Sequence, residues 1–253
     1  MLKSFFSAIV FQPLYNALII LYVIYPDMGV SIVLLTLIIR FLILPIARKS
    51  IESQKKMQEI QPQLKKIQQK YKNDKQLQGQ KVMEFYKQNK INPAGGCLPL
   101  IIQLIIFIAL YRVFMLGLGE GISTDLLYSF TKNPGQPNPI AFGFLDLTAP
   151  SIPLAFAVAI LQFVQGKMMM LKNKKNQPKK EPEKNDEPDF ASMMQTQMIY
   201  MMPIMILFLG FKFSSGLLLY WATTTIFMIV QQYYVIKKDG NVSLKEIFSF
   251  KKD

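Results

Sequence analysis

The stretch from Met28 to Arg48, MGVSIVLLTLIIRFLILPIAR, decides the fold of this 253-residue chain. The 19 residues from Gly29 to Ala47 carry a single charge and are long enough to cross a bilayer as a helix. That charge belongs to Arg40, which lies about 3 Å along the helix axis from the middle of the stretch. A permanently protonated guanidinium near the bilayer centre costs roughly 3 kcal/mol on insertion scales. We therefore expect Arg40 to face water, a polar partner or a binding site rather than lipid.

The distribution of apolar residues predicts an all-α polytopic membrane protein. Hydrophobic residues make up 51% of the chain and occur in long blocks separated by lysine-rich segments. The chain contains one cysteine, Cys97, and no histidine, which excludes a disulfide framework and a histidine-ligated metal. We expect no cofactor and no metal, and we expect neither a cleavable signal nor a lipobox cysteine near the start. Five blocks have the length of membrane spans: about 29–47, 97–116, 151–170, 195–211 and 216–236.

The first apolar segment, residues 4–24, has two interpretations. Gln12, Pro13 and Asn16 interrupt its first half, and the short link YPDMG joins it to the helix of Arg40. We expect residues 1–28 to form a helix that lies in the membrane interface. A sixth span is the alternative, and the very apolar second half of the segment favours it.

Residues 48–94 predict a basic cytoplasmic helical hairpin. Between residues 48 and 92 there are twelve basic and four acidic side chains. A turn is expected at 72–76, KNDKQ, and Pro62 should bend or interrupt the first arm. The hairpin is either a solvated linker or a basic surface that docks lipid, ribosomal RNA or a nascent chain. Apolar residues of the first arm recur at helical spacing, and a second stripe follows the turn: Met57, Ile60, Leu64, Ile67 and Tyr71, then Leu77, Met83 and Tyr86.

The loops predict the orientation of the chain in the membrane. Positive residues concentrate at 48–92, 167–184 and in the tail 237–253, whereas the loop at 117–150 is net acidic. By the positive-inside rule the basic segments are cytoplasmic, so the N-terminus lies outside and the C-terminus inside. The lysine-rich stretch 172–189 is of low complexity and is predicted to be a flexible loop.

The polar residues inside the predicted spans indicate a binding site. All sixteen Asp and Glu residues fall outside the five spans, so no carboxylate within a span neutralises Arg40. A wetted cavity around a fixed positive charge explains the set best. For any one amide or aromatic residue taken singly, hydrogen bonding or packing between helices is the better explanation, whereas for Arg40 it is not. The candidate lining residues are Arg40, Thr36, Gln103, Gln165, Tyr220 and Trp221.

The same residues exclude several classes of protein. A proton-coupled transporter usually needs a titratable group in the membrane, and Arg40 does not titrate. An intramembrane metalloprotease needs histidine ligands, which the chain lacks. Lys212 with Ser214 or Ser215 in one short turn is weak evidence for a protease dyad. We therefore expect a protein that is not an enzyme.

The chain resembles the YidC-type membrane protein insertases of the Oxa/YidC/Alb superfamily. The resemblance rests on stretches that occur in the family's order: QPLYNAL, GVSIVLLTLIIRFLILP, MQEIQPQLKKIQQKY, INPAGGCLPLIIQLIIFIALYR, and FSSGLLLYW followed by IVQQYY. It implies five spans around a hydrophilic groove, open to the cytoplasm and to lipid, with an amphipathic outer helix and a cytoplasmic hairpin. Arg40 matches the groove arginine, and Thr36, Gln103, Gln165 and Trp221 match groove-lining positions.

The expected function is insertion of nascent membrane proteins from the cytoplasmic side into the bilayer of the bacterial cell membrane. The expected partners are nascent clients, the ribosome, anionic lipids and a Sec-type translocon, with the chain acting as a monomer. Two alternatives remain open: a small-solute or anion transporter that uses Arg40, and a scaffold that only binds ribosomes through its basic hairpin.

Overall fold

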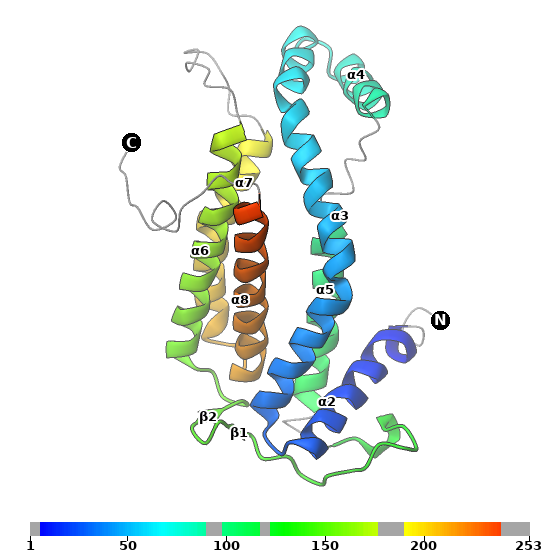
Figure 1. Cartoon of the computed structure of the whole chain (residues 1–253), viewed down its shortest axis with the longest axis vertical. Helices are drawn as coiled ribbons and strands as arrows, with labels where there is room; N and C mark the ends of the chain where they lie inside the picture. The colour runs from blue at the N-terminus through cyan, green and yellow to red at the C-terminus, as the bar shows by residue number, and fades with distance from the viewer. Residues whose placement is uncertain (1–5, 90–97, 117–121, 177–189, 239–253) are drawn as a thin grey trace.

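The computed structural model describes residues 6–89, 98–116, 122–176 and 190–238. Cys97, most of the predicted low-complexity loop and the tail beyond residue 238 lie outside the described residues. The described part is mostly helical, as predicted (Figure 1). Its elements in chain order are η1 (Ser7–Phe11), α2 (Gln12–Ile24), α3 (Met28–Lys70), α4 (Lys75–Gln88), α5 (Leu98–Phe114), η4 (Thr124–Leu126), β1 (Ile140–Ala141), β2 (Leu145–Asp146), α6 (Ile152–Asn176), α7 (Phe190–Gly210) and α8 (Ser215–Lys238).

Helix α3 combines the predicted span 29–47 and the first arm of the hairpin in one element of 43 residues. Asp27 caps its first turn, because the side-chain Oδ1 accepts the backbone N–H of Val30 at 3.0 Å. The helix continues through Pro45 and Pro62, so of the two effects predicted for Pro62, a bend or an interruption, the interruption is wrong. Each proline removes one backbone hydrogen bond, and the cooperative turns on either side maintain the helix.

The basic hairpin is formed by the far end of α3 and by α4, which lies beside it away from the other helices (Figure 1). The turn begins at Tyr71, and Asp74 caps α4 by accepting the N–H of Leu77 at 2.9 Å. Gln78 joins the arms by donating to the carbonyl of Gln68 at 2.6 Å. The predicted turn, 72–76, therefore overlaps the first residues of α4.

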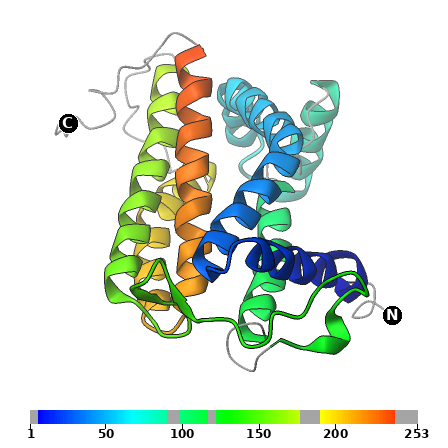
Figure 2. The ribbon, with the colours of Figure 1, turned by 60° about the horizontal axis from the view of Figure 1, so that its bottom comes forward.

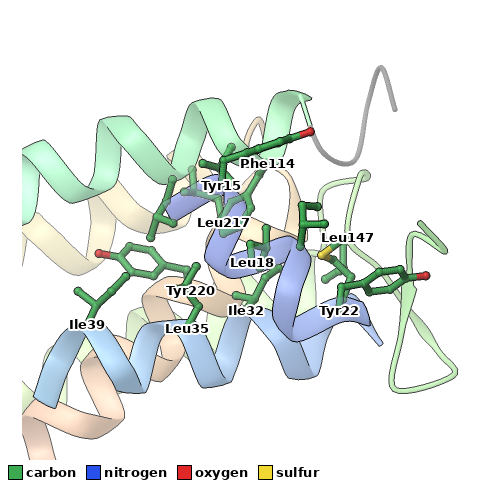
Figure 3. Packing of buried hydrophobic residues seen from close by; sticks show 14 of the residues in the cluster. Tyr15, Leu18, Tyr22, Ile32, Leu35, Ile39, Phe114, Leu147, Leu217 and Tyr220 are labelled. Atoms are coloured by element: carbon green, nitrogen blue, oxygen red, sulfur yellow. The ribbon is translucent and has the colours of Figure 1, made fainter. Parts of the chain in front are cut away.

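Helix α8 packs against both α3 and α6 and so joins two groups of helices. Helices α2, α3 and α5 lie on one side of it, and α6 and α7 on the other (Figure 1). The buried side chains divide in the same way. One cluster joins α2, α3, α5 and the start of α8, and includes Tyr15, Ile32 and Leu217 (Figure 3). A second cluster joins α6, α7 and α8 through Ala155, Ile206, Leu218 and their neighbours.

An ordered cap covers the end of the bundle at which α3 begins. It comprises residues 122–151 and contains a two-stranded antiparallel hairpin in which Ile140 pairs with Asp146. Ala141 and Leu147 of the cap are fully buried in the first cluster. Helix α2 runs across this same end at a steep angle to α3, as Figure 2 shows. The sequence predicted only a polar loop here, and burial of the cap is the main difference.

Large apolar side chains lie exposed along the helices, as expected for surfaces that face lipid. Examples are Leu42 on α3, Ile160 on α6 and Phe208 on α7, with exposed fractions of 72%, 62% and 69%. Within the described residues, Ser7–Ile24 and Met28–Ser50 are long and apolar enough to cross a membrane. Shorter apolar helices comprise Ile101–Phe114, Ile152–Met168 and Tyr200–Gly210.

Candidate functional site: a partly buried arginine bonded across three helices

Arg40 is bonded to a polar chain that crosses three helices. Its Nη2 donates to Oε1 of Gln103 on α5 at 2.5 Å. The Nε2 of Gln103 in turn donates to the hydroxyl oxygen of Tyr220 on α8 at 2.7 Å. Tyr220 is buried, and its ring lies beside Ile39 and Leu35 of α3 (Figure 3). The structure thus brings together three of the six predicted site residues.

The neighbouring helices place no anion beside Arg40 that would neutralise its charge. None of the residues in α5, α6, α7 or α8 is Asp or Glu, and the first acid of α3 is Glu52. Gln103 supplies a neutral oxygen, which satisfies a donor of the guanidinium without cancelling its charge, and Tyr220 accepts from Gln103. The arrangement is therefore suited to attract a negative group of a ligand.

Thr36 lies one helical turn before Arg40 and is buried. Its hydroxyl donates to the carbonyl of Ile32 at 2.6 Å, so it is bonded within its own helix. Its position near Arg40 therefore follows from the i, i+4 spacing on α3, and its hydrogen bond does not join the chain of Arg40.

Gln165 belongs to a second polar cluster, between α6 and α8. Its Oε1 accepts from Gln162 Nε2 at 2.9 Å, and its Nε2 lies 3.8 Å from the sulfur of Met228. The hydroxyl of Thr225 donates to Gln162 Oε1 at 3.4 Å. The sequence grouped Gln165 with Arg40, whereas its bonded partners in the structure are on α6 and α8.

Trp221 lies between α5 and the second apolar cluster. Its ring meets that of Phe107 edge-on, with centroids 5.6 Å apart, and its flank packs against the cluster of α6, α7 and α8. Because it follows Tyr220 directly, it points to a different side of α8. Trp221 is therefore a packing residue in this conformation, next to the polar chain.

A third polar network, which the sequence did not assign to a site, holds the cap against α2. Asn16 is buried; its amide donates to the carbonyl of Leu126 at 2.8 Å, and its Oδ1 accepts the N–H of Tyr128 at 2.7 Å. Gln12 also donates to Leu126. The signal was present in the sequence: two amides four residues apart share one face of an otherwise apolar helix.

Two tyrosine hydroxyls on α2 and a serine at the start of α8 also form hydrogen bonds with the cap. The hydroxyl oxygens of Tyr15 and Tyr22 accept the N–H groups of Ser123 and Asn138 at 2.9 and 3.0 Å. At the start of α8, the hydroxyl of Ser215 donates to the carbonyl of Ala149 at 2.6 Å. Ser215 is 1% exposed, so its hydroxyl has a structural role, which argues against a protease dyad with Lys212.

In the part of the chain that the structure describes, no cluster of three or more His, Cys, Asp or Glu residues is arranged to hold a metal ion. Fold and site together define a class of protein: a polytopic helical membrane protein with an arginine bonded to neutral side chains across its helices. A family model described as 60Kd inner membrane protein matches residues 20–241, and the chain belongs to this family of bacterial inner membrane proteins.

Curated relatives agree with this assignment. The chain is 34% identical over 237 residues to a protein of Rickettsia massiliae (strain Mtu5) and 32% identical over 233 residues to one of Methylobacterium sp. (strain 4-46), both named membrane protein insertase YidC. Each match covers 90% of this chain but only 39% and 35% of the relative. The chain thus spans less than half the length of these relatives.

A solved structure supports the same conclusion. The structure titled "Active YidC insertase crystal structure with the first transmembrane domain resolved" matches with a TM-score of 0.56 and 25% identity. The match covers 85% of this chain and 43% of that chain. The predicted resemblance to YidC-type insertases is confirmed.

Proposed function

We propose that this chain inserts membrane proteins into the bilayer, with Arg40 as the residue that first attracts the client. The proposal rests on one observation: the guanidinium of Arg40 donates to Gln103, which in turn donates to Tyr220, and the helices α5 and α8 that carry these two residues contain no acid. The curated relatives named membrane protein insertase YidC support the activity. No covalent step is needed, so the chain acts without catalysis, cofactor or metal.

The attraction is strong enough to matter in this environment. A client carboxylate at about 4 Å from Arg40 gains roughly 4 kcal/mol at an effective dielectric constant of ~20, against ~1 kcal/mol in water. An acidic tail or loop of the client therefore enters from the cytoplasmic side and reaches the guanidinium. Thr36, Gln103, Gln165, Tyr220 and Trp221 line the groove that we propose for this segment.

The apolar segment of the client then passes into lipid along the exposed faces of the helices. Burial of apolar surface in lipid supplies the driving force, at roughly 25 cal/mol per Å². We further propose that the basic hairpin contacts the ribosome and anionic lipids, with a Sec-type translocon as a further partner. The chain has its N-terminus outside, residues 1–28 in the interface, and works as a monomer.

The test reconstitutes the pure protein in liposomes with two single-span clients that differ only in an acidic or a neutral tail. Arg40→Ala is expected to lose insertion of the acidic client and to spare the neutral one, whereas Arg40→Lys retains much of both because a cation remains. Arg112→Ala is the matched control, since it removes an exposed arginine from the end of α5.

Thermal stability in detergent is measured for every variant alongside insertion. Equal loss for both clients with lowered stability makes Arg40 a structural residue and refutes the attraction. Full activity of all variants removes Arg40 from the mechanism, and solute transport is then assayed.

A further inference from the structure

The turn of the cap hairpin carries exposed aromatic rings at a place where backbone geometry does not favour them. We call residues 140–144, IAFGF, the aromatic turn. Phe142 and Gly143 both have positive φ, 54° and 79°, and Phe144 donates its N–H to the carbonyl of Ala141 at 3.1 Å. Asn-Gly is the usual pair in a turn with two left-handed residues. A phenylalanine at the first of these positions therefore indicates a role for its ring.

The rings of the aromatic turn project from a fixed base. Ala141 is fully buried, whereas Phe142 is 41% and Phe144 81% exposed. The two ring centroids lie 6.3 Å apart. The base is held by the N–H of Phe142, which donates to Asp27 Oδ2 at 2.7 Å, and by Leu147, whose carbonyl accepts the N–H of Gly216 at 3.0 Å.

The aromatic turn meets α3 at the first residues of its membrane-crossing segment. That segment begins at Met28. A Cβ on Gly29 would lie 2.9 Å from ring atoms of Phe142, so the ring packs directly on the helix at this level. Ile24 and Tyr25, just before Asp27, are also exposed, by 73% and 57%. The rings thus continue the apolar exposed surface at the edge of the span.

We propose that the aromatic turn is a lipid anchor, with Phe142 and Phe144 seated in the headgroup boundary of the leaflet opposite the basic hairpin. The stretch 139–145 carries no charge, which favours lipid over an acidic or basic protein partner. Aromatic rings are enriched at this depth of a bilayer. The anchor fixes the cap, and through it the starts of α3 and α8, at the level of the membrane surface.

The test places the chain's only tryptophan at the tip. The variant Trp221→Phe with Phe144→Trp is reconstituted in phosphatidylcholine and phosphatidylglycerol vesicles whose acyl chains carry bromine near the headgroup or near the tail end. Bromine near the headgroup is expected to quench most of the fluorescence. Gln136→Trp, in the same background and on an exposed part of the same cap, is the control and is expected to be quenched by aqueous iodide instead.

Two outcomes overturn the proposal. In one, both tryptophans respond to iodide alike and neither to bromine, which places the turn in water. In the other, the tryptophan at position 144 is quenched by neither iodide nor bromine, but dilution in excess lipid makes it accessible to iodide. That result identifies a second copy of the chain as the partner. If Trp221→Phe lowers stability, a bimane-labelled cysteine at position 144 in a Cys97→Ser background gives the same readout.

The variant Phe142→Asn separates anchoring from folding. Asparagine tolerates left-handed φ, so the turn and the circular dichroism spectrum are expected to persist while quenching at position 144 falls. Undiminished quenching would show that Phe142 only packs on α3, and the paired anchor would be wrong.

Discussion

Phe142 donates its backbone N–H to Oδ2 of Asp27 across 115 positions of sequence, at 2.7 Å. The other oxygen of the same carboxylate accepts from Val30 and caps α3. One side chain therefore starts the helix of Arg40 and fastens the cap to it.

Asp27→Ala is expected to destabilise the protein by about 1–3 kcal/mol, because it removes a helix cap and leaves the N–H of Phe142 unpaired. Thermal unfolding in detergent micelles measures the loss. Asp125→Ala removes an exposed acid from the same cap and serves as the control. An equal shift in both variants would mean that only net charge matters.

Asn16→Leu is expected to loosen the cap while leaving the helices intact. It removes two donors and one acceptor from a buried site, including the acceptor for the N–H of Tyr128. Hydrogen exchange at the amide of Tyr128 should accelerate by at least about tenfold, equivalent to ~1.4 kcal/mol. Gln136→Leu, on the exposed part of the cap, should leave that amide unchanged. Protection retained in Asn16→Leu would show that the loop is held by other contacts.

Gln103→Glu is expected to abolish the preference for acidic clients without lowering stability. The new carboxylate takes the place of the amide oxygen that accepts from Arg40, so an ion pair forms inside the bundle and neutralises the site. Gln162→Glu adds the same charge to the other polar cluster and is the control. Insertion of the matched clients is measured together with the melting temperature. An unchanged preference for the acidic client would contradict the attraction model.

The orientation is tested by single cysteines at positions 72 and 136 in a Cys97→Ser background. Position 72 lies in the turn of the basic hairpin and position 136 in the cap, at opposite ends of the molecule (Figure 1). A membrane-impermeant maleimide should label them from opposite sides, with position 72 cytoplasmic. Labelling from the same side contradicts the five-span topology. A cysteine in place of Lys3 distinguishes an interfacial first helix from a sixth span.

Deletion of residues 52–88 is expected to impair insertion while the remaining helices stay assembled. The deleted part lies beyond the segment of α3 that packs in the first apolar cluster, and no side chain of α4 is buried. Insertion of both clients and size-exclusion behaviour in detergent are compared with the full chain. Unimpaired insertion would make the hairpin a solvated linker.

The sequence by itself determined the helices, the basic hairpin and the presence of a charged residue, Arg40, near the middle of an apolar span. Hydrophobic length and charge are local properties, and each apolar block became a helix because the backbone of such a segment must satisfy its own hydrogen bonds. The pairing of Gln103 with Arg40 and Tyr220 was anticipated only as a shared neighbourhood, since hydropathy contains no information on which helix faces which. Gln165 does not join the hydrogen bonds of Arg40, Gln103 and Tyr220, and this depends on how α6 is rotated against α8.

The cap was decided by tertiary structure alone. In the sequence, Gln12 and Asn16 only interrupt an apolar run. They hold the cap in the structure because residues more than 100 positions away supply the backbone groups that they bind. Short strands and irregular loops have no periodicity that a sequence can display, whereas burial of Ala141 and Leu147 fixes them in space. A helix is encoded by its own residues, but a loop acquires its shape from the surface on which it packs.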